Sequence, residues 1–170
     1  GLLQAVNAVT GERLWSFPGT IWGQPVESGG RVFVNVDNVG VVALDAQTGA
    51  EVWRYTSPLD DLFGQSSPAV SPDGSTVIVC DGSATVYALA TSDGTPRWSR
   101  PLGGVKCDST PAITPDYVVQ YVWGSEGDYQ DHLYLLSLAT GEVITHTVPS
   151  TYGSAVASPA VVGDLVFLAD

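Results

Sequence analysis

Residues that could do chemistry are few in this chain, and none of them is spaced as a catalytic or metal site. The two histidines, His132 and His146, have no cysteine or further histidine at the spacing of metal ligands. Motifs of the Gly-x-Ser-x-Gly type are absent, and no glycine-rich turn continues into the Gly-Lys-Ser/Thr of a phosphate loop. The sequence therefore predicts no catalytic, cofactor-binding or metal-binding residue, and we expect His132 to lie at a strand edge.

The two cysteines, Cys80 and Cys107, are 27 residues apart. Their number and spacing match neither a disulfide framework nor a metal-binding motif. We interpret them as small buried hydrophobic side chains, with a disulfide between them as the alternative.

An acidic and aromatic segment interrupts the otherwise regular pattern of the chain. It contains Trp123, Glu126, Asp128, Tyr129 and Asp131. Its carboxylates could bind calcium, but they lack the twelve-residue spacing of a calcium loop. One interpretation is a solvated hairpin tip. The other is a loop that contacts a partner protein, with Trp123 and Tyr129 as aromatic anchors.

The elements that position these residues are predicted from an eleven-residue segment that recurs along the chain. Residues 5–15, 43–53 and 88–98 each place an alanine six residues before a glycine and a tryptophan four residues after it. Residues 135–145 keep the glycine but have Thr145 in place of the tryptophan. Since glycine permits positive φ and tryptophan buries a large apolar surface, we expect each indole to pack on the alanine and glycine of an adjoining unit. The predicted contact residues are Ala5, Gly11, Trp15, Ala43, Asp45, Gly49, Trp53, Ala88, Gly94, Trp98 and Gly141.

A second series of markers lies between these segments. Pro25, Pro68, Pro111 and Pro159 are spaced by 43, 43 and 48 residues, a period typical of propeller blades or helical repeats. Short β-branched and aromatic runs separated by turn residues favour strands. The sequence therefore predicts an all-β chain, a β-propeller of four-stranded antiparallel blades. Complete blades are expected at residues 24–55, 65–100 and 108–148, with half blades at residues 1–17 and 157–170.

Residues 42–53 and 66–70, Val-Ala-Leu-Asp-Ala-Gln-Thr-Gly-Ala-Glu-Val-Trp and Ser-Ser-Pro-Ala-Val, resemble the pyrroloquinoline quinone (PQQ)-like repeat. This resemblance implies a propeller of seven or eight blades joined by a tryptophan-docking motif. Dehydrogenases of this kind use two adjacent cysteines against the quinone and a Glu, Asn and Asp set for calcium, and this chain has no Cys-Cys pair. The interpretation is a non-catalytic binding scaffold. The alternatives are a fragment of a PQQ- and calcium-dependent dehydrogenase, or a sensor domain of a membrane-attached enzyme. The resemblance also implies a periplasmic or extracellular location.

Charge limits the class of partner. The chain of 170 residues has a net charge of −12 and only six lysines and arginines, which argues against nucleic acid and anionic lipid and favours a basic or neutral partner protein. No apolar run reaches the length of a membrane span. Because the chain contains no methionine, we expect a section of a larger propeller. Pairing of the two half blades into a four-bladed ring, or assembly of two copies into an eight-bladed ring, are the alternatives.

Overall fold

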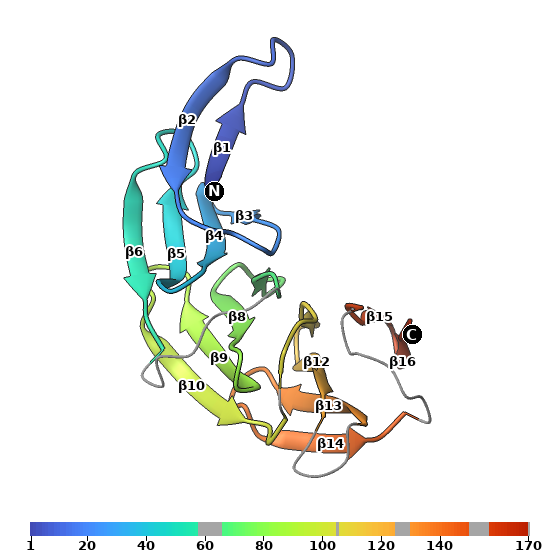
Figure 1. Ribbon diagram of the computed structural model, residues 1–170. Helices are drawn as coiled ribbons and strands as arrows, with labels where there is room; N and C mark the ends of the chain where they lie inside the picture. The colour runs from blue at the N-terminus through green and yellow to red at the C-terminus, as the bar shows by residue number, and fades with distance from the viewer. Residues whose placement is uncertain (58–65, 105, 125–129, 150–156, 170) are drawn as a thin grey trace.

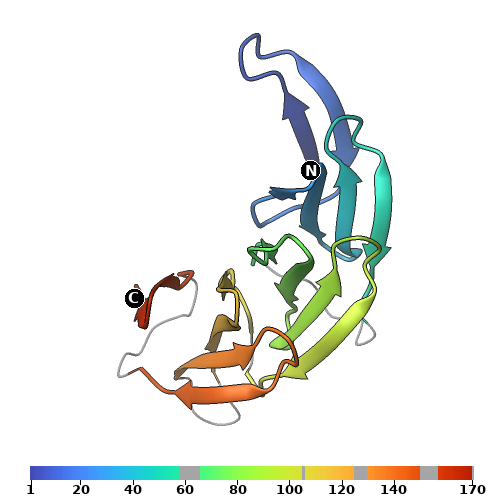
Figure 2. The same ribbon diagram turned by 180° about the vertical axis from the view of Figure 1, so that it is seen from behind.

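The computed structural model describes residues 1–57, 66–104, 106–124, 130–149 and 157–169, and these residues form strands and turns without a helix. Three four-stranded antiparallel sheets lie between two two-stranded sheets. Figures 1 and 2 show the five sheets following one another along an open arc, with the outer strands β6, β10 and β14 on its convex side. The chain is therefore an all-β propeller, and the predicted fold class is confirmed.

Each sheet is built from strands that follow one another in the sequence. The N-terminal half blade contains β1 (Leu2–Val6) and β2 (Arg13–Pro18). The first blade contains β3 (Val26–Ser28), β4 (Arg31–Val36), β5 (Gly40–Asp45) and β6 (Glu51–Tyr55). The second contains β7 (Ala69–Val70), β8 (Thr76–Cys80), β9 (Thr85–Ala90) and β10 (Pro96–Pro101). The third contains β11 (Ala112–Ile113), β12 (Tyr117–Trp123), β13 (Asp131–Ser137) and β14 (Val143–Thr147). The C-terminal half blade contains β15 (Ala160–Val162) and β16 (Leu165–Phe167).

The two half blades form separate sheets at opposite ends of the arc, as Figure 1 shows. Each therefore presents uncovered apolar side chains. Leu2, Val6 and Leu14 are exposed on the N-terminal half blade, and Val162, Leu165 and Phe167 on the C-terminal one. Pairing of the half blades into a four-bladed ring is not observed.

The hydrophobic core is divided among the seams between neighbouring sheets. Alternate residues of a strand face opposite sides of its sheet, so each blade contributes one face to each of two seams. The three clusters are Val34, Val42 and Leu44 with Leu3, Trp15 and Phe17; Phe33, Ala43 and Trp53 with Val77, Tyr87 and Leu89; and Ile78, Val86 and Ala88 with Val118, Tyr134 and Leu136.

A tryptophan of each of the first three sheets along the chain lies against a glycine of the next sheet. A Cβ added at Gly94 would come within 2.6 Å of the Trp53 ring, and Gly49 and Gly141 stand in the same relation to Trp15 and Trp98. The indole Nε1 of Trp53 also donates to the Thr91 carbonyl oxygen at 3.0 Å. The corresponding bonds run from Trp15 to Ala46 and from Trp98 to Leu138. A glycine is required at these turns both for space and for a φ near +70°.

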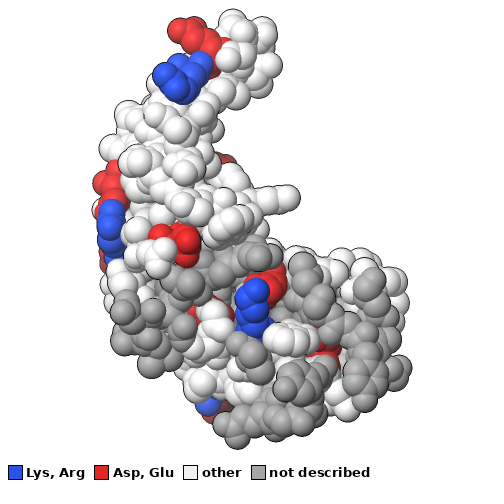
Figure 3. All heavy atoms as spheres, in the orientation of Figure 1, with Lys and Arg blue, Asp and Glu red and all other residues white. Residues whose placement is uncertain are grey.

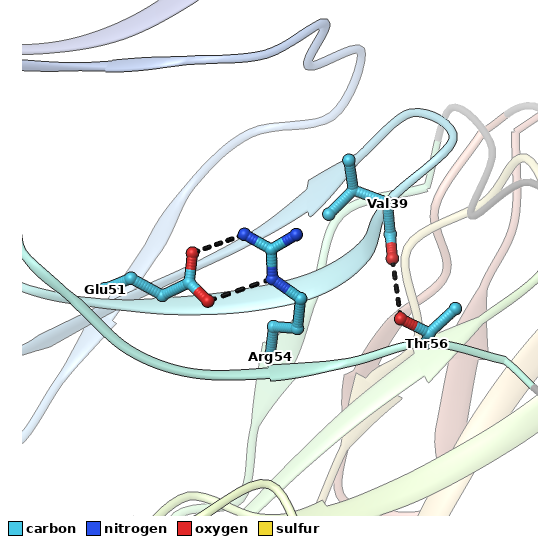
Figure 4. A network of polar contacts seen from close by, with 4 residues as sticks. All are labelled: Val39, Glu51, Arg54 and Thr56. Carbon is cyan, nitrogen blue, oxygen red and sulfur yellow. Dashed lines mark hydrogen bonds and ion pairs between the residues drawn. The ribbon is translucent and has the colours of Figure 1, made fainter.

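Charged side chains are few and scattered on the face shown in Figure 3. On β6, Arg54 forms an ion pair with Glu51, in which Nε lies 2.9 Å from Oε1 (Figure 4). This contact lowers the pKa of Glu51 and raises that of Arg54. Thr56 donates its hydroxyl to the Val39 carbonyl oxygen at 3.0 Å in the same view. Because the ion pair is local and solvent-exposed, it contributes little to stability.

The cysteines are bonded to each other, which corrects the expectation of two unbonded thiols. Cys80 ends β8 of the second blade, and Cys107 precedes β11 of the third. Both residues are fully buried in the seam between these blades. Spacing along the sequence gave no signal because the bond joins two different repeats.

We predict that Trp53→Ala lowers the free energy of unfolding by at least about 2 kcal/mol more than Trp22→Ala, because it removes a large side chain from a packed seam. Trp53 is 8% exposed and Trp22 is 64% exposed. Urea denaturation followed by circular dichroism measures both variants against the unsubstituted protein. Equal midpoints for the two variants would contradict this role of the indole.

We predict that reduction of the Cys80–Cys107 bond destabilises the protein by about 3.5 kcal/mol, the chain-entropy value for the 27-residue separation. The measurement is thermal unfolding with and without dithiothreitol. The Cys80→Ala, Cys107→Ala double variant is the control and should not respond to the reductant. A wild-type melting temperature that does not change on reduction would show that the bond has no stabilising effect.

Candidate functional site

The predicted contact residues lie at the turns and seams, where they position the blades. Asp45 Oδ1 accepts the backbone N–H of Thr48 at 2.8 Å and the Thr48 hydroxyl at 2.8 Å. These hydrogen bonds lower the pKa of Asp45. The carboxylate therefore closes its own turn. Gly11 is in the corresponding turn of the N-terminal half blade, where nothing lies within 4 Å of an added Cβ.

The alanines differ from the expectation that they would receive the indole of an adjoining blade. Ala43 pairs with Trp53 of its own sheet and lies on the same side of that sheet. Ala5 pairs in the same way with Trp15, and Ala88 with Trp98. The expectation failed because the periodic sequence does not show on which side of the sheet the neighbouring indole packs.

The predicted partner loop is fixed at its base. Trp123 ends β12 and exchanges backbone hydrogen bonds with Lys106, and Gly124 donates its N–H to the Gln130 carbonyl oxygen at 2.9 Å. Asp131 is 1% exposed, and its Oδ2 accepts the Tyr121 hydroxyl at 3.0 Å. Asp131 is therefore a buried residue of the blade and not part of an exposed contact surface. Glu126, Asp128 and Tyr129 lie outside the described residues.

The two histidines come together, which corrects the expectation that they are isolated. His132 Nδ1 lies 2.7 Å from His146 Nε2, and both rings stack with Tyr134. His132 is buried, and the pair joins β13 to β14. Within the described part of the chain, no group of three or more His, Cys, Asp or Glu residues is placed to hold a metal ion.

A second buried polar group closes the turn between β8 and β9. Asp81 accepts the Thr85 N–H at 2.9 Å and the Tyr87 hydroxyl at 2.9 Å. Burial, together with the Asp81 carboxylate, raises the pKa of Tyr87 to about 12. Ser57 lies 2.9 Å from the same hydroxyl. Ser57, Asp81 and Tyr87 are therefore buried residues that are hydrogen-bonded to one another.

A concave feature of the described residues lies at the inner ends of the blades. We call it the central hollow. It has a volume of about 450 Å³ and is lined by Trp22, Gly23, Gln24, Ser67, Asp108, Thr110 and Ser158. Gln24, Ser67, Thr110 and Ser158 each precede the repeated proline, so four successive repeats contribute one wall residue each. The hollow is therefore formed by equivalent positions of four repeats and not by one loop.

Hydrogen bonds connect these wall residues from sheet to sheet. The Gln24 N–H donates to Ser67 Oγ at 2.7 Å, and the Ser67 N–H donates to Thr110 Oγ1 at 3.0 Å. The Thr110 N–H donates in turn to Ser158 Oγ at 3.0 Å. We call this series the hydroxyl row. The sequence analysis missed it, although a hydroxyl residue before three of the four prolines is its signal.

Asp108 lies beside the hydroxyl row. Its Oδ2 forms an ion pair with Lys106 Nζ at 2.7 Å, while its buried Oδ1 has no hydrogen-bond partner among the described residues. Lys106 is also the residue bonded to Trp123 through the backbone. The base of the predicted partner loop and the central hollow therefore lie at the same end of the third blade.

Solved structures with the same fold include BamB from Moraxella catarrhalis, with a TM-score of 0.75 and 24% identity over 98% of this chain and 48% of that one. Quinohemoprotein alcohol dehydrogenase from Comamonas testosteroni has a TM-score of 0.65 and 19% identity, over 76% of this chain and 21% of that one. These likenesses support the propeller fold alone, because both identities are low.

Curated relatives match a large part of the chain. Outer membrane protein assembly factor BamB of Shewanella oneidensis is 29% identical over 160 residues, covering 85% of this chain and 38% of that protein. Serine/threonine-protein kinase AfsK of Streptomyces griseus is 31% identical over 150 residues, covering 84% of this chain and 18% of that protein. The chain thus spans less than half the length of these relatives.

The family comparison covers the chain from end to end. The model described as outer membrane protein assembly factor BamB matches residues 1–170, including every sheet and both half blades. The chain therefore belongs to the family of outer membrane protein assembly factor BamB, a PQQ-like repeat propeller family.

Proposed function

We propose that this chain is a section of a seven- or eight-bladed propeller that serves as a protein-binding scaffold. The observation that carries the proposal is the match over residues 1–170 to a family named for an assembly factor. The remaining blades would cover the exposed apolar side chains of the two half blades. Leu165 and Phe167 are two such side chains, large and apolar yet exposed, as expected of a sheet face that packs against a further blade.

The internal design of the described blades supports a scaffold. Indole–glycine contacts and a disulfide fix the blades relative to one another. Buried ionisable groups such as Asp81 are used in closing turns. A rigid frame with loops at its ends is suited to presenting a partner surface.

The partner surface that we propose is the loop between β12 and β13. Its base is held by Trp123 and Gln130, next to Lys106. The net charge of −12 favours a basic or neutral partner and opposes nucleic acid. The described residues contain no helix of the length and hydrophobicity needed to cross a bilayer.

An oxidising compartment at the cell envelope fits this function. The Cys80–Cys107 bond requires oxidising conditions to persist, and the first relatives are named for assembly at the outer membrane. We propose a periplasmic or extracellular location on these two grounds.

The similarity to the kinase AfsK favours a second candidate, a sensor domain attached to an enzyme. In that case the propeller binds a signal and the catalytic residues lie elsewhere. The quinone-dependent dehydrogenase is the weaker alternative. Among the described residues, those that line the central hollow include no lysine or arginine to bind the carboxylates of the quinone, and Cys80 and Cys107 are not adjacent.

A photocrosslinking residue at position 129 of the full-length protein tests the scaffold. We expect adducts with a discrete protein in the native cell extract and fewer adducts at 0.5 M salt, since the loop is acidic. The same residue at position 52, which is exposed on β6, is the matched control and should give few adducts. Equal labelling from both positions, or none from position 129, would contradict a partner-binding loop.

We also predict that the full-length protein does not bind PQQ in the presence of calcium. The measurement is quinone absorbance retained after gel filtration, followed by reduction of an electron-accepting dye with alcohols. Retained quinone at one equivalent together with dye reduction would replace the scaffold with the dehydrogenase.

A further inference from the structure

We propose that the central hollow binds a neutral saccharide. This goes beyond the scaffold function, because the ligand is a small molecule and its site is made by the inner ends of the blades. The argument depends on one aromatic ring, one row of hydroxyl groups and one neutralised charge, all at the wall of the same hollow.

Trp22 supplies the apolar platform. It is the most exposed tryptophan of the described residues and lines the hollow, whereas Trp15, Trp53 and Trp98 are used in the seams. A flat indole left in water is unfavourable unless a ligand covers it. The C–H face of a sugar ring is a ligand surface of matching shape.

The hydroxyl row supplies the polar contacts. Ser67, Thr110 and Ser158 each accept one backbone N–H, which uses one lone pair of each oxygen. Within the described part of the chain, none of the three hydroxyls donates to a protein acceptor. Each hydroxyl therefore retains one donor and one lone pair for a ligand. Sugar hydroxyls combine a donor and an acceptor in the same way, so they complement such a row.

The charges at the wall favour a neutral ligand. Asp108 is compensated by Lys106 at 2.7 Å, and among the described residues no other charged side chain lines the hollow. An anionic ligand would meet Asp108 without an uncompensated cation, and a cationic ligand would compete with Lys106. The Gln24 side chain adds a neutral amide with both donors and an acceptor.

The repeat itself marks the site. Trp22 and Asp108 occupy the same place in two repeats, three residues before the proline, and both line the hollow. The residue directly before the proline carries a hydroxyl in three of the four repeats, whereas the residue three before the proline is aromatic in one repeat and acidic in another. The variable position therefore gives the hollow its chemistry. Its volume of about 450 Å³ lies in the range of small-molecule sites and suits two or three sugar rings.

Saturation-transfer NMR on the full-length protein tests the proposal with maltotriose, cellotriose and triacetylchitotriose as probes. We expect at least one of them to receive saturation at millimolar concentration. Trp22→Ala should weaken that binding by about tenfold or more, and Trp22→Phe should retain most of it, because a flat ring remains. Val52→Ala, which truncates an exposed apolar side chain on the outer strand β6, is the control and should bind as the wild type does.

Circular dichroism of each variant separates loss of binding from loss of folding. Absence of saturation transfer to all three trisaccharides would overturn the proposal. So would equal binding by wild type and Trp22→Ala, or displacement of the sugar by trilysine or by PQQ, which would assign the hollow to a charged ligand. Because the photocrosslinking test uses the loop at position 129, failure here leaves the scaffold function unaffected.

Discussion

The contact between an indole and a glycine is the constraint on which the arrangement of the blades depends. The glycine is required twice over, because an added Cβ would overlap the ring and because the turn has a positive φ. The indole N–H then donates to a carbonyl oxygen of the same neighbouring turn. Apolar packing alone would permit the sheets to slide, whereas this directional bond sets their relative position.

The stability of such an array is the sum of blade terms and nearest-neighbour seam terms. The seams of this chain are therefore not equivalent. The seam between the second and third blades has an indole contact and also the Cys80–Cys107 bond. Beyond the third blade, Thr145 replaces the tryptophan, and the C-terminal half blade is held by the bonds from Tyr117 to Gly163 and from Thr110 to Ser158. Indole docking ends where the repeat has diverged.

Most of the fold could be predicted from the sequence because its cause is periodic. Alternating strand residues, turn glycines and regularly spaced prolines recur in each blade, so each blade forms the same local structure. Contacts between repeats were harder to predict from the sequence. Ala43 could contact the tryptophan of its own sheet or the tryptophan of the neighbouring sheet. The outcome depends on which side of the sheet each side chain faces, and the repeated sequence is the same in both cases.

Two pairs that the sequence did not predict, or gave only as the alternative, have the same physical origin. Cys80 and Cys107 belong to different repeats, and His132 and His146 lie on adjacent strands at diagonal positions. Their separations along the chain carry no recognisable motif, because the fold creates the proximity. Asp131 was assigned to the loop because it is charged. It is buried, and it accepts a hydrogen bond from Tyr121 that the sequence alone does not reveal.

The candidate site follows from comparing the repeats with one another. Residues that most repeats share, such as the turn glycines and the hydroxyl residues before three of the four prolines, are explained by joining the blades. A position that differs among repeats while facing the same hollow has no such explanation. Trp22 and Asp108 are in that position. The indole of Trp22 is exposed to water, and the buried Oδ1 of Asp108 has no hydrogen-bond partner among the described residues, and both arrangements have a cost in free energy. Both costs would be offset by one ligand, which is why the exceptions in the repeat, and not the repeat itself, carry the specific function.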